Sequence, residues 1–162
     1  MTEKSLAHAL LTKLENHITS HSFGESPREL YEPITYIMSL GGKRIRPLLS
    51  LLAYGLYDKN PEEILSQAAA VEVFHNFTLM HDDIMDQAPL RRGKATVHEK
   101  WNANIAILSG DVMLVRAYDL LLGTDPKLLP EVIRLFNKTA AEVCEGQQFD
   151  MNFEAYETVH ED

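Results

Sequence analysis

Apolar residues recur along most of the chain at intervals of three or four, the spacing that places them on one side of an α-helix. One clear series is Leu6, Leu10, Leu14 and Ile18. Alternation with a period of two is scarce, and neither an Asn-Gly nor an Asp-Gly hairpin turn occurs. The pattern predicts an all-α helical bundle with helices at about 3–20, 27–40, 45–58, 61–86, 98–122 and 126–150.

Proline marks three of the predicted helix starts. Ser26-Pro27 and Asn60-Pro61 each place a capping side chain before a proline, and a glutamate follows at the third helical position. Asp125-Pro126 repeats the cap and the proline without the glutamate. We therefore expect the side chains of Ser26, Asn60 and Asp125 to cap helices.

The chain has 162 residues, which suits a single all-α domain over residues 1–162. Its formal net charge of -9 argues against a nucleic-acid partner. A single cysteine, Cys144, excludes an internal disulfide and is typical of a reducing compartment. No apolar run approaches the ~18–20 residues of a membrane span, and no signal-peptide core follows Met1. We predict a cytoplasmic protein without a membrane span.

Three aspartates, Asp82, Asp83 and Asp86, stand at the end of the predicted fourth helix. Asp82 and Asp86 lie one turn apart on the same face, so their carboxylates can bind the same cation. A few hard oxygen ligands suit Mg²⁺, which keeps several waters and takes phosphate oxygens from a substrate. A solvated acidic helix end is the alternative. His75 lies two turns earlier on nearly the same stripe and is either a buried structural histidine or part of this site.

Two basic segments flank the acidic cluster. Gly41-Gly42-Lys43-Arg44-Ile45-Arg46-Pro47 interrupts two predicted helices, and its cations suit a diphosphate unless it is simply a solvated turn. Arg46 precedes a proline, so we expect it to leave the helical path. Arg91-Arg92-Gly93 follows the aspartates and either holds the same metal-bound phosphate or pairs with the aspartates.

Together, the segments GGKRIRP at 41–47, DDIMD at 82–86 and RRG at 91–93 resemble the trans-isoprenyl diphosphate synthases, also called polyprenyl synthetases. The resemblance extends from the first helix to GQQFD at 146–150, and it implies the helical bundle of the isoprenoid synthases. Ala95 departs from the family, which commonly has proline there. A second aspartate-rich motif, which family members carry on a later helix, does not follow Asp150. The chain is therefore identified as the N-terminal part of a longer synthase.

The resemblance implies Mg²⁺-dependent prenyl transfer from an allylic diphosphate to isopentenyl diphosphate. It assigns Mg²⁺ and catalysis to Asp82 and Asp86, with Asp83 assisting, and contact with the allylic diphosphate to Arg91. It assigns the binding of isopentenyl diphosphate to four residues: Lys43, Arg46, His75 and Arg92. Gln147 and Asp150 match a family motif near the active site, which implies roles for both there.

The resemblance also bears on product length and assembly. In the family a bulky residue five positions before the first aspartate forms a floor for the hydrocarbon tail; here it is Phe77, followed by the small Thr78. Short products, farnesyl or geranylgeranyl diphosphate, are expected, unless Phe77 is ordinary core. A homodimer or higher oligomer is expected, with the helices near 98–150 at the interface. We also expect a mobile acidic tail after about Gln147, at most weak binding of a diphosphate, and no turnover by this chain alone.

Two other functions remain open. His81-Asp82 is a literal HD pair with His75 upstream, which is compatible with an HD-type metal phosphohydrolase. That hypothesis leaves both basic segments unexplained. A non-catalytic partner subunit of a prenyl synthase is the second alternative, although an intact aspartate cluster argues against it. His81 and His98 are otherwise predicted to be structural or surface residues.

Overall fold

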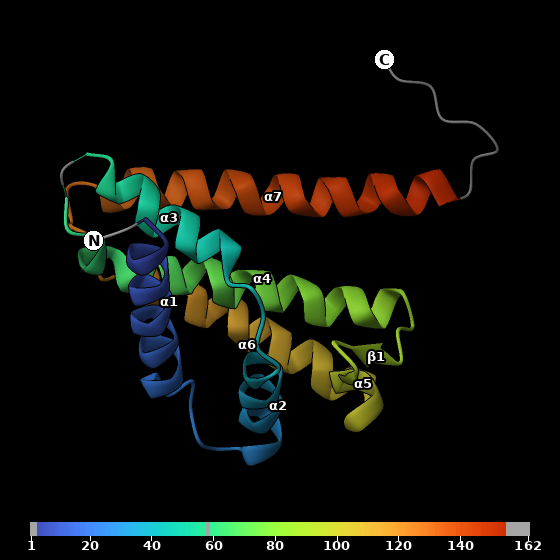
Figure 1. Cartoon of the computed structure of the whole chain (residues 1–162). Coiled ribbons are helices and arrows are strands. Elements are labelled where there is room, and N and C mark those ends of the chain that lie inside the picture. The colour runs from blue at the N-terminus through green and yellow to red at the C-terminus, as the bar shows by residue number, and fades with distance from the viewer. Residues whose placement is uncertain (1–2, 58, 155–162) are drawn as a thin grey trace. The chain divides into compact units, whose positions relative to one another are not determined.

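The computed structural model describes residues 3–57 and 59–154, and nearly all of its regular structure is helical (Figure 1). The all-α prediction is confirmed. The residues form two compact units, Met1–Gly123 and Thr124–Asp162. A single domain over residues 1–162 stays a prediction.

The first unit contains most of the elements. They are α1 (Glu3–Ser20), α2 (Arg28–Ser39), α3 (Ile45–Gly55), the 3₁₀ turn η1 (Pro61–Ile64), α4 (Leu65–Met85), β1 (Leu90–Arg91), β2 (Lys94–Ala95), α5 (Val97–Lys100) and α6 (Ala103–Leu121). The first four predicted helices therefore lie within a few residues of their predicted bounds. The predicted helix at 98–122 is instead two helices, α5 and α6. Asn102 separates them, because its backbone is extended and its side chain accepts a hydrogen bond from the Ile105 N–H at 2.9 Å.

The predicted caps have different outcomes. Asn60 is confirmed, because its side chain accepts a hydrogen bond from the Glu62 N–H at the start of η1. Ser26 is wrong: Pro27 occupies the cap position of α2 and makes no side-chain cap bond. Asp125 accepts a hydrogen bond from the Lys127 N–H, but in a turn that precedes the next helix.

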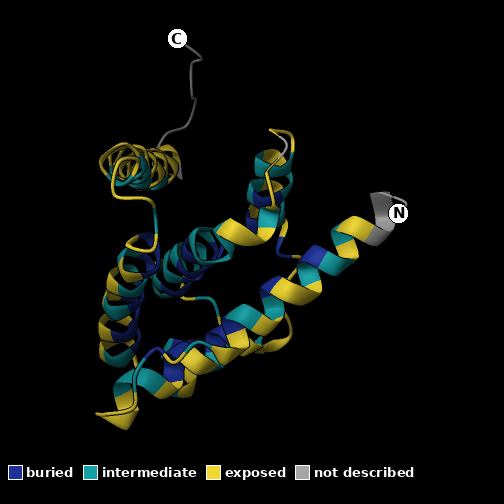
Figure 2. Cartoon of the chain, turned by 90° about the vertical axis from the view of Figure 1, so that its left-hand side faces the viewer, coloured by how far each residue is buried: buried dark blue, intermediate teal, exposed yellow. Residues whose placement is uncertain are grey.

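Helix α4 is the centre of the first unit, and it packs chiefly against α6 while also contacting α1, α2, α3 and α5. Its fully buried side chains include Val73 and Met80, and Met113 is buried opposite on α6. Gly110 of α6 permits the close approach, because a Cβ there would collide with the ring of His81 on α4. The buried residues gather on the inner sides of these helices (Figure 2). This packing fixes the position of the C-terminal end of α4, which carries Asp82 and Asp83.

A short antiparallel hairpin, β1 and β2, follows α4 and pairs Leu90 with Ala95 and Arg91 with Lys94. Its turn residues Arg92 and Gly93 both have positive φ, at 53° and 75°. A two-residue hairpin with positive φ at both central positions follows the twist of the strands. The sequence pattern missed this hairpin because arginine, rather than asparagine or aspartate, precedes the glycine.

The second unit contains α7 (Leu129–Glu154). The prediction of a mobile tail after Gln147 is wrong as far as Glu154, because the helix continues through these residues. Side chains one turn apart support it: Gln148 donates a hydrogen bond to Asn152 at 3.0 Å, and the rings of Phe149 and Phe153 stack. The remainder of the predicted tail, residues 155–162, lies outside the described residues. Among the described helices, none is both long and apolar enough for a membrane span.

Candidate active site

The four residues predicted to hold isopentenyl diphosphate line one cavity of about 470 Å³ in the first unit. They come from three places in the sequence: Lys43 and Arg46 from the start of α3 and the loop before it, His75 from α4, and Arg92 from the hairpin turn. Lys43, Arg46 and Arg92 are exposed, so their cationic groups remain available to a ligand. The structure therefore brings together all four residues of this prediction.

The loop before α3 has an unusual backbone. Gly41, Gly42 and Arg44 all have positive φ, at 73°, 150° and 48°. Gly42 also lies against the Arg92 guanidinium, since a Cβ there would be 3.0 Å from Nη1 of that arginine. Glycine at this position lets the two basic segments approach each other. The expectation that Arg46 leaves the helix is wrong, because α3 begins at Ile45 and tolerates Pro47 in its first turn, where backbone N–H groups have no helical partner.

His75 accepts a hydrogen bond from Arg46, whose Nη1 lies 3.2 Å from the His75 Nε2. A guanidinium can only donate, so Nε2 carries no proton in this contact. Burial lowers the pKa of His75, and the positive charge of Arg46 lowers it further, whereas Glu72 acts in the opposite direction. The cavity thus presents a neutral imidazole beside exposed cations.

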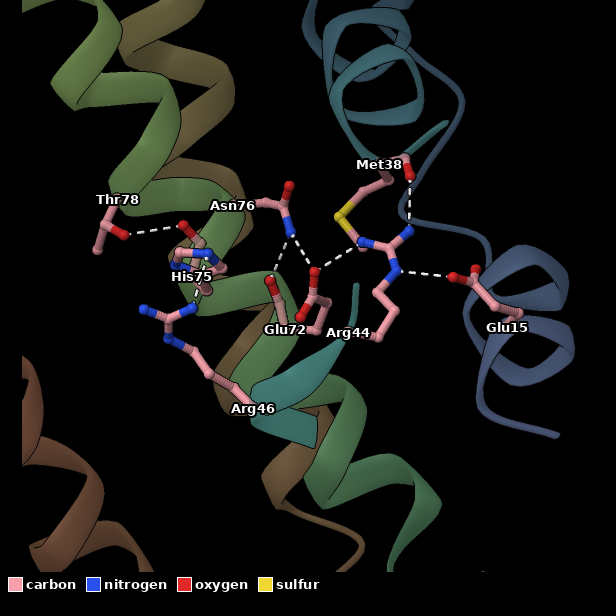
Figure 3. A network of polar contacts seen from close by, with 8 residues as sticks. All are labelled: Glu15, Met38, Arg44, Arg46, Glu72, His75, Asn76 and Thr78. Carbon is pink, nitrogen blue, oxygen red and sulfur yellow. Dashed lines mark hydrogen bonds and ion pairs between the residues drawn. The ribbon is translucent and has the colours of Figure 1, made fainter. Parts of the chain in front are cut away.

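Arg44 is the residue that the sequence analysis missed. It is buried, and its guanidinium donates hydrogen bonds to Glu15 of α1 at 2.8 Å, to Glu72 of α4 at 2.6 Å and to the carbonyl of Met38 at 3.0 Å (Figure 3). In the sequence it is one of three cations in a basic segment, and no local pattern separates it from Lys43 or Arg46. Its role follows only from packing.

The three aspartates occupy different environments. Asp83 is buried, with 3% of its side chain exposed, and it accepts three hydrogen bonds of 2.7 to 3.0 Å from Arg91. Asp82 is half-buried and lies 4.0 Å from Arg91, while Asp86 is exposed at the C-cap of α4. The hydrogen bonds to Asp83 raise the pKa of Arg91. Of the two predicted uses of the arginines, pairing with an aspartate is therefore what Arg91 does, whereas Arg92 lines the basic cavity.

Asp82 is half-buried and Asp86 is exposed, so solvent reaches both carboxylates. Within residues 3–57 and 59–154 no group of three or more His, Cys, Asp or Glu side chains is placed to hold a metal. One or two carboxylates are nevertheless the usual protein ligands of Mg²⁺ at a phosphate substrate, with water and phosphate oxygens completing the shell. The donor set therefore fits Mg²⁺ held together with a diphosphate.

Phe77 and Thr78 both lie on α4 between the basic cavity and the aspartates. The Phe77 ring contacts Phe74 on its own helix at 5.7 Å and packs edge-on against His81 at 4.7 Å between ring centroids. Thr78 donates a hydrogen bond to the His75 carbonyl at 2.8 Å. These contacts place Phe77 on the side of α4 that faces α6, because His81 in turn lies against Gly110.

His81 and His98 do not line the basic cavity. Nε2 of His81 lies 3.2 Å from the Ile107 carbonyl of α6, and His98 is mostly buried beside Glu99. The HD pair therefore diverges: His81 points to α6 while Asp82 lies near Arg91. Both histidines have the structural surroundings that were expected of them.

Gln147 and Asp150 lie on α7, three residues apart and so on one face of that helix. Gln147 is half-buried and Asp150 is exposed. Both belong to the second unit.

Residues 27–162 match the family model described as Polyprenyl synthetase. The chain belongs to the polyprenyl synthetase family. This confirms the resemblance seen in the sequence motifs.

Curated relatives agree with the family assignment. A short chain isoprenyl diphosphate synthase of Methanocaldococcus jannaschii is 41% identical over 91% of this chain and 45% of its own length. A geranylgeranyl diphosphate synthase of Methanosarcina mazei is 42% identical over 83% of this chain and 42% of its own length. The chain thus spans less than half the length of these curated relatives.

Solved structures of polyprenyl synthetases show the same fold. A geranylgeranyl pyrophosphate synthase superposes with a TM-score of 0.87 at 48% identity, covering 98% of this chain and 47% of that protein. The geranylgeranyl pyrophosphate synthetase of Pyrococcus horikoshii superposes with a TM-score of 0.88 at 34% identity, covering 96% and 49%.

Proposed function

We propose that this polyprenyl synthetase chain binds isopentenyl diphosphate and an allylic diphosphate for Mg²⁺-dependent prenyl transfer. The observation that carries the proposal is the convergence of Lys43, Arg46, His75 and Arg92 on one cavity, with the aspartates further along the same helix as His75. In this reaction the allylic carbon–oxygen bond breaks and diphosphate leaves. The isopentenyl double bond forms the new carbon–carbon bond, and loss of a proton gives an allylic diphosphate that is longer by one isoprene unit.

The basic cavity holds the diphosphate of isopentenyl diphosphate in this proposal. Lys43 supplies a mobile point charge, while Arg46 and Arg92 supply planar groups that bind two phosphate oxygens at once. His75 is neutral and accepts from Arg46, so it orients that guanidinium without adding charge. Preorganised cations of this kind bind a polyanion without having to rearrange.

The allylic diphosphate lies at the aspartates, where Asp82 and Asp86 hold Mg²⁺. When bound, Mg²⁺ supplies positive charge that neutralises the departing diphosphate. Asp83 keeps Arg91 beside this site through their ion pair, so the guanidinium stays next to the diphosphate even though one edge of it is occupied. The role of Asp83 is then to position Arg91 rather than to bind the metal.

The product is proposed to be short, farnesyl or geranylgeranyl diphosphate. The support is Phe77, a bulky side chain on α4 five residues before Asp82, with the small Thr78 after it. Several curated relatives carry names that include geranylgeranyl diphosphate synthase, which is compatible with this length. A full-length enzyme that carries Phe77→Ala should make longer products than its parent. Products of unchanged length would show that Phe77 is an ordinary core residue.

We further propose that the chain by itself does not turn over, because residues 1–162 carry one aspartate-rich cluster where the family mechanism uses two. Association with another copy as a homodimer or higher oligomer is part of the proposal. Its support is the apolar side chains that α6 exposes: Ile107, Leu108 and Val115. The proposal also includes a cytoplasmic location and roles near the active site for Gln147 and Asp150.

Calorimetric titration of the chain with isopentenyl diphosphate tests the proposal. We expect Arg46→Ala to weaken binding by about 1.5–3 kcal/mol, which is about 10–150-fold, because a charged hydrogen bond is lost. Arg28→Ala is the matched control, since Arg28 is an exposed arginine that pairs with Glu32 on α2, away from the cavity. An equal loss in both variants would refute the assignment.

Product analysis separates the alternatives. After incubation with Mg²⁺, isopentenyl diphosphate and an allylic starter, we expect no elongated prenyl diphosphate. Steady formation of an elongated product would disprove the proposed inactivity. Release of phosphate from nucleotides would favour a phosphohydrolase. Co-purification with a longer synthase would favour a non-catalytic subunit.

A further inference from the structure

The buried guanidinium of Arg44 joins three separate elements of the first unit. Glu15 of α1, Glu72 of α4 and the carbonyl at Met38 of α2 each accept a hydrogen bond from it (Figure 3). Only 2% of the Arg44 side chain is exposed, and only 3% of the Glu72 side chain. A buried charge without its partners is strongly unfavourable, so the folded chain has to keep this arrangement.

The loop that carries Arg44 lies between two cavities. Gly42, Lys43 and Arg44 line the basic cavity of about 470 Å³ on one side. The same three residues line a second cavity of about 530 Å³ on the other side, against α1 residues that include His8 and Glu15. Between these two cavities, the Arg44 side chain attaches the loop to α1, α2 and α4.

Arg44 also neutralises a carboxylate of the basic cavity, that of Glu72. Glu72 lines that cavity on α4, one turn before His75, and an uncompensated carboxylate there would repel a diphosphate. Arg44 neutralises it from the buried side at 2.6 Å, and the Asn76 side chain donates a further hydrogen bond to the same Oε1 atom at 3.0 Å. The cavity can thus contain a glutamate and still attract an anion.

We infer that Glu15, Arg44 and Glu72 form a positioning unit through which α1 sets the affinity of the basic cavity for a diphosphate. Arg44 acts through its neighbours in this inference, because its guanidinium is already bonded to Glu15, Glu72 and the Met38 carbonyl. It holds the loop so that Lys43 and Arg46 face the cavity, and it neutralises Glu72. Glu15 is the outer support of the unit and reaches Arg44 from α1, none of whose described side chains lines the basic cavity. The diphosphate as ligand rests on the proposed function.

Glu15 is the position at which the inference is tested, because it can be changed without leaving a buried charge alone. Its side chain is 41% exposed, and Arg44 keeps Glu72 as its partner. Glu62 is the matched control: it is 43% exposed and also forms an ion pair with α1, through Lys13, but it lies outside the basic cavity. The variants are Glu15→Gln, Glu15→Ala and Glu62→Gln.

The sign of the effect separates positioning from simple electrostatics. Removing a negative charge near a cationic cavity strengthens anion binding by Coulomb attraction alone. Positioning predicts the opposite: Glu15→Ala should weaken isopentenyl diphosphate binding roughly 5–20-fold, because part of a charged hydrogen-bond network is lost. Glu15→Gln keeps an oxygen acceptor and should weaken binding less. Glu62→Gln should change affinity less than about twofold.

The experiment is calorimetric titration of the 162-residue chain with isopentenyl diphosphate, together with NMR spectra that follow the amides of Gly41, Gly42 and Lys43. Weakened binding with shifted loop amides in Glu15→Ala supports the inference. Unchanged or tighter binding with shifted amides overturns it, because Arg44 would then be purely structural.

Failure of the proposed function has a different signature. In that case the unaltered chain does not bind isopentenyl diphosphate, and the inference is judged with inorganic pyrophosphate as the probe. Weaker pyrophosphate binding in Glu15→Ala than in Glu62→Gln, with shifted loop amides, still supports the positioning unit. Loop amides that do not shift, or pyrophosphate binding that does not weaken, overturn it.

Discussion

Exchanging individual aspartates of the cluster Asp82, Asp83 and Asp86 should separate folding from metal binding. Asp83→Asn is the main perturbation, because it keeps the size of the side chain and removes the charge that binds Arg91. Asp86→Asn is its matched control in the same cluster, since Asp86 is exposed. We expect Asp83→Asn to lower stability and to leave Mg²⁺ binding largely in place. We expect Asp86→Asn to leave stability nearly unchanged and to weaken Mg²⁺ binding.

The magnitude follows from the geometry of the ion pair. Asp83 is 3% exposed and receives three short hydrogen bonds from Arg91, so the exchange breaks a mostly buried pair, which typically costs about 3–5 kcal/mol. Arg91 retains 23% exposure and can be solvated by water, and relief of repulsion from the neighbouring aspartates returns part of the loss. We therefore expect about 2–3 kcal/mol, or a melting temperature roughly 4–12 °C lower. Asp86→Asn should stay within about 0.5 kcal/mol.

Thermal unfolding followed by circular dichroism measures the first quantity, and Mg²⁺ titration in the presence of a diphosphate measures the second. A double-mutant cycle with Arg91→Gln should recover most of the Asp83 effect as coupling between the two residues. If Asp83→Asn melts within about 1 °C of the unaltered chain and loses Mg²⁺ as Asp86→Asn does, then Asp83 is a metal ligand and the reasoning is wrong.

Three further predictions concern the basic cavity and its supports. Folding lowers the pKa of His75 below 6.5, so the unfolded chain takes up the proton first as the pH falls. The free energy of unfolding should therefore decrease below about pH 6.5. In urea unfolding, His75→Gln should make this decrease smaller. Gly42→Ala should weaken diphosphate binding roughly tenfold in calorimetry, because its Cβ would displace the Arg92 guanidinium, whereas Gly41→Ala, which also has positive φ but open space around it, should lose only stability. Tyr36→Phe should lower the free energy of unfolding by about 1 kcal/mol, because the tyrosine hydroxyl donates a hydrogen bond of 2.7 Å to the Ala95 carbonyl; an unchanged denaturation midpoint would contradict this.

Local patterns in the sequence determined the helical fold and the acidic cluster. Helical periodicity depends on residues three and four apart, so the positions of α1 to α4 and the shared face of Asp82 and Asp86 could be predicted without knowledge of packing. The break between α5 and α6 was missed, because Asn102 caps a helix in the middle of a continuous apolar pattern. Motif order was sufficient to indicate the family, which the comparison then confirmed.

Tertiary structure decided what each charged residue does. Arg44 and Arg46 stand in one basic segment, yet packing buries the first between Glu15 and Glu72 and leaves the second exposed in the cavity. Arg91 and Arg92 are adjacent, yet the positive φ of the hairpin turn directs one to Asp83 and the other to Gly42. These partners lie from 8 to 50 residues apart in the sequence. The physical reason is that burial and ion pairing depend on which distant segments pack together in the bundle. A pattern of neighbouring residues does not specify those long-range contacts.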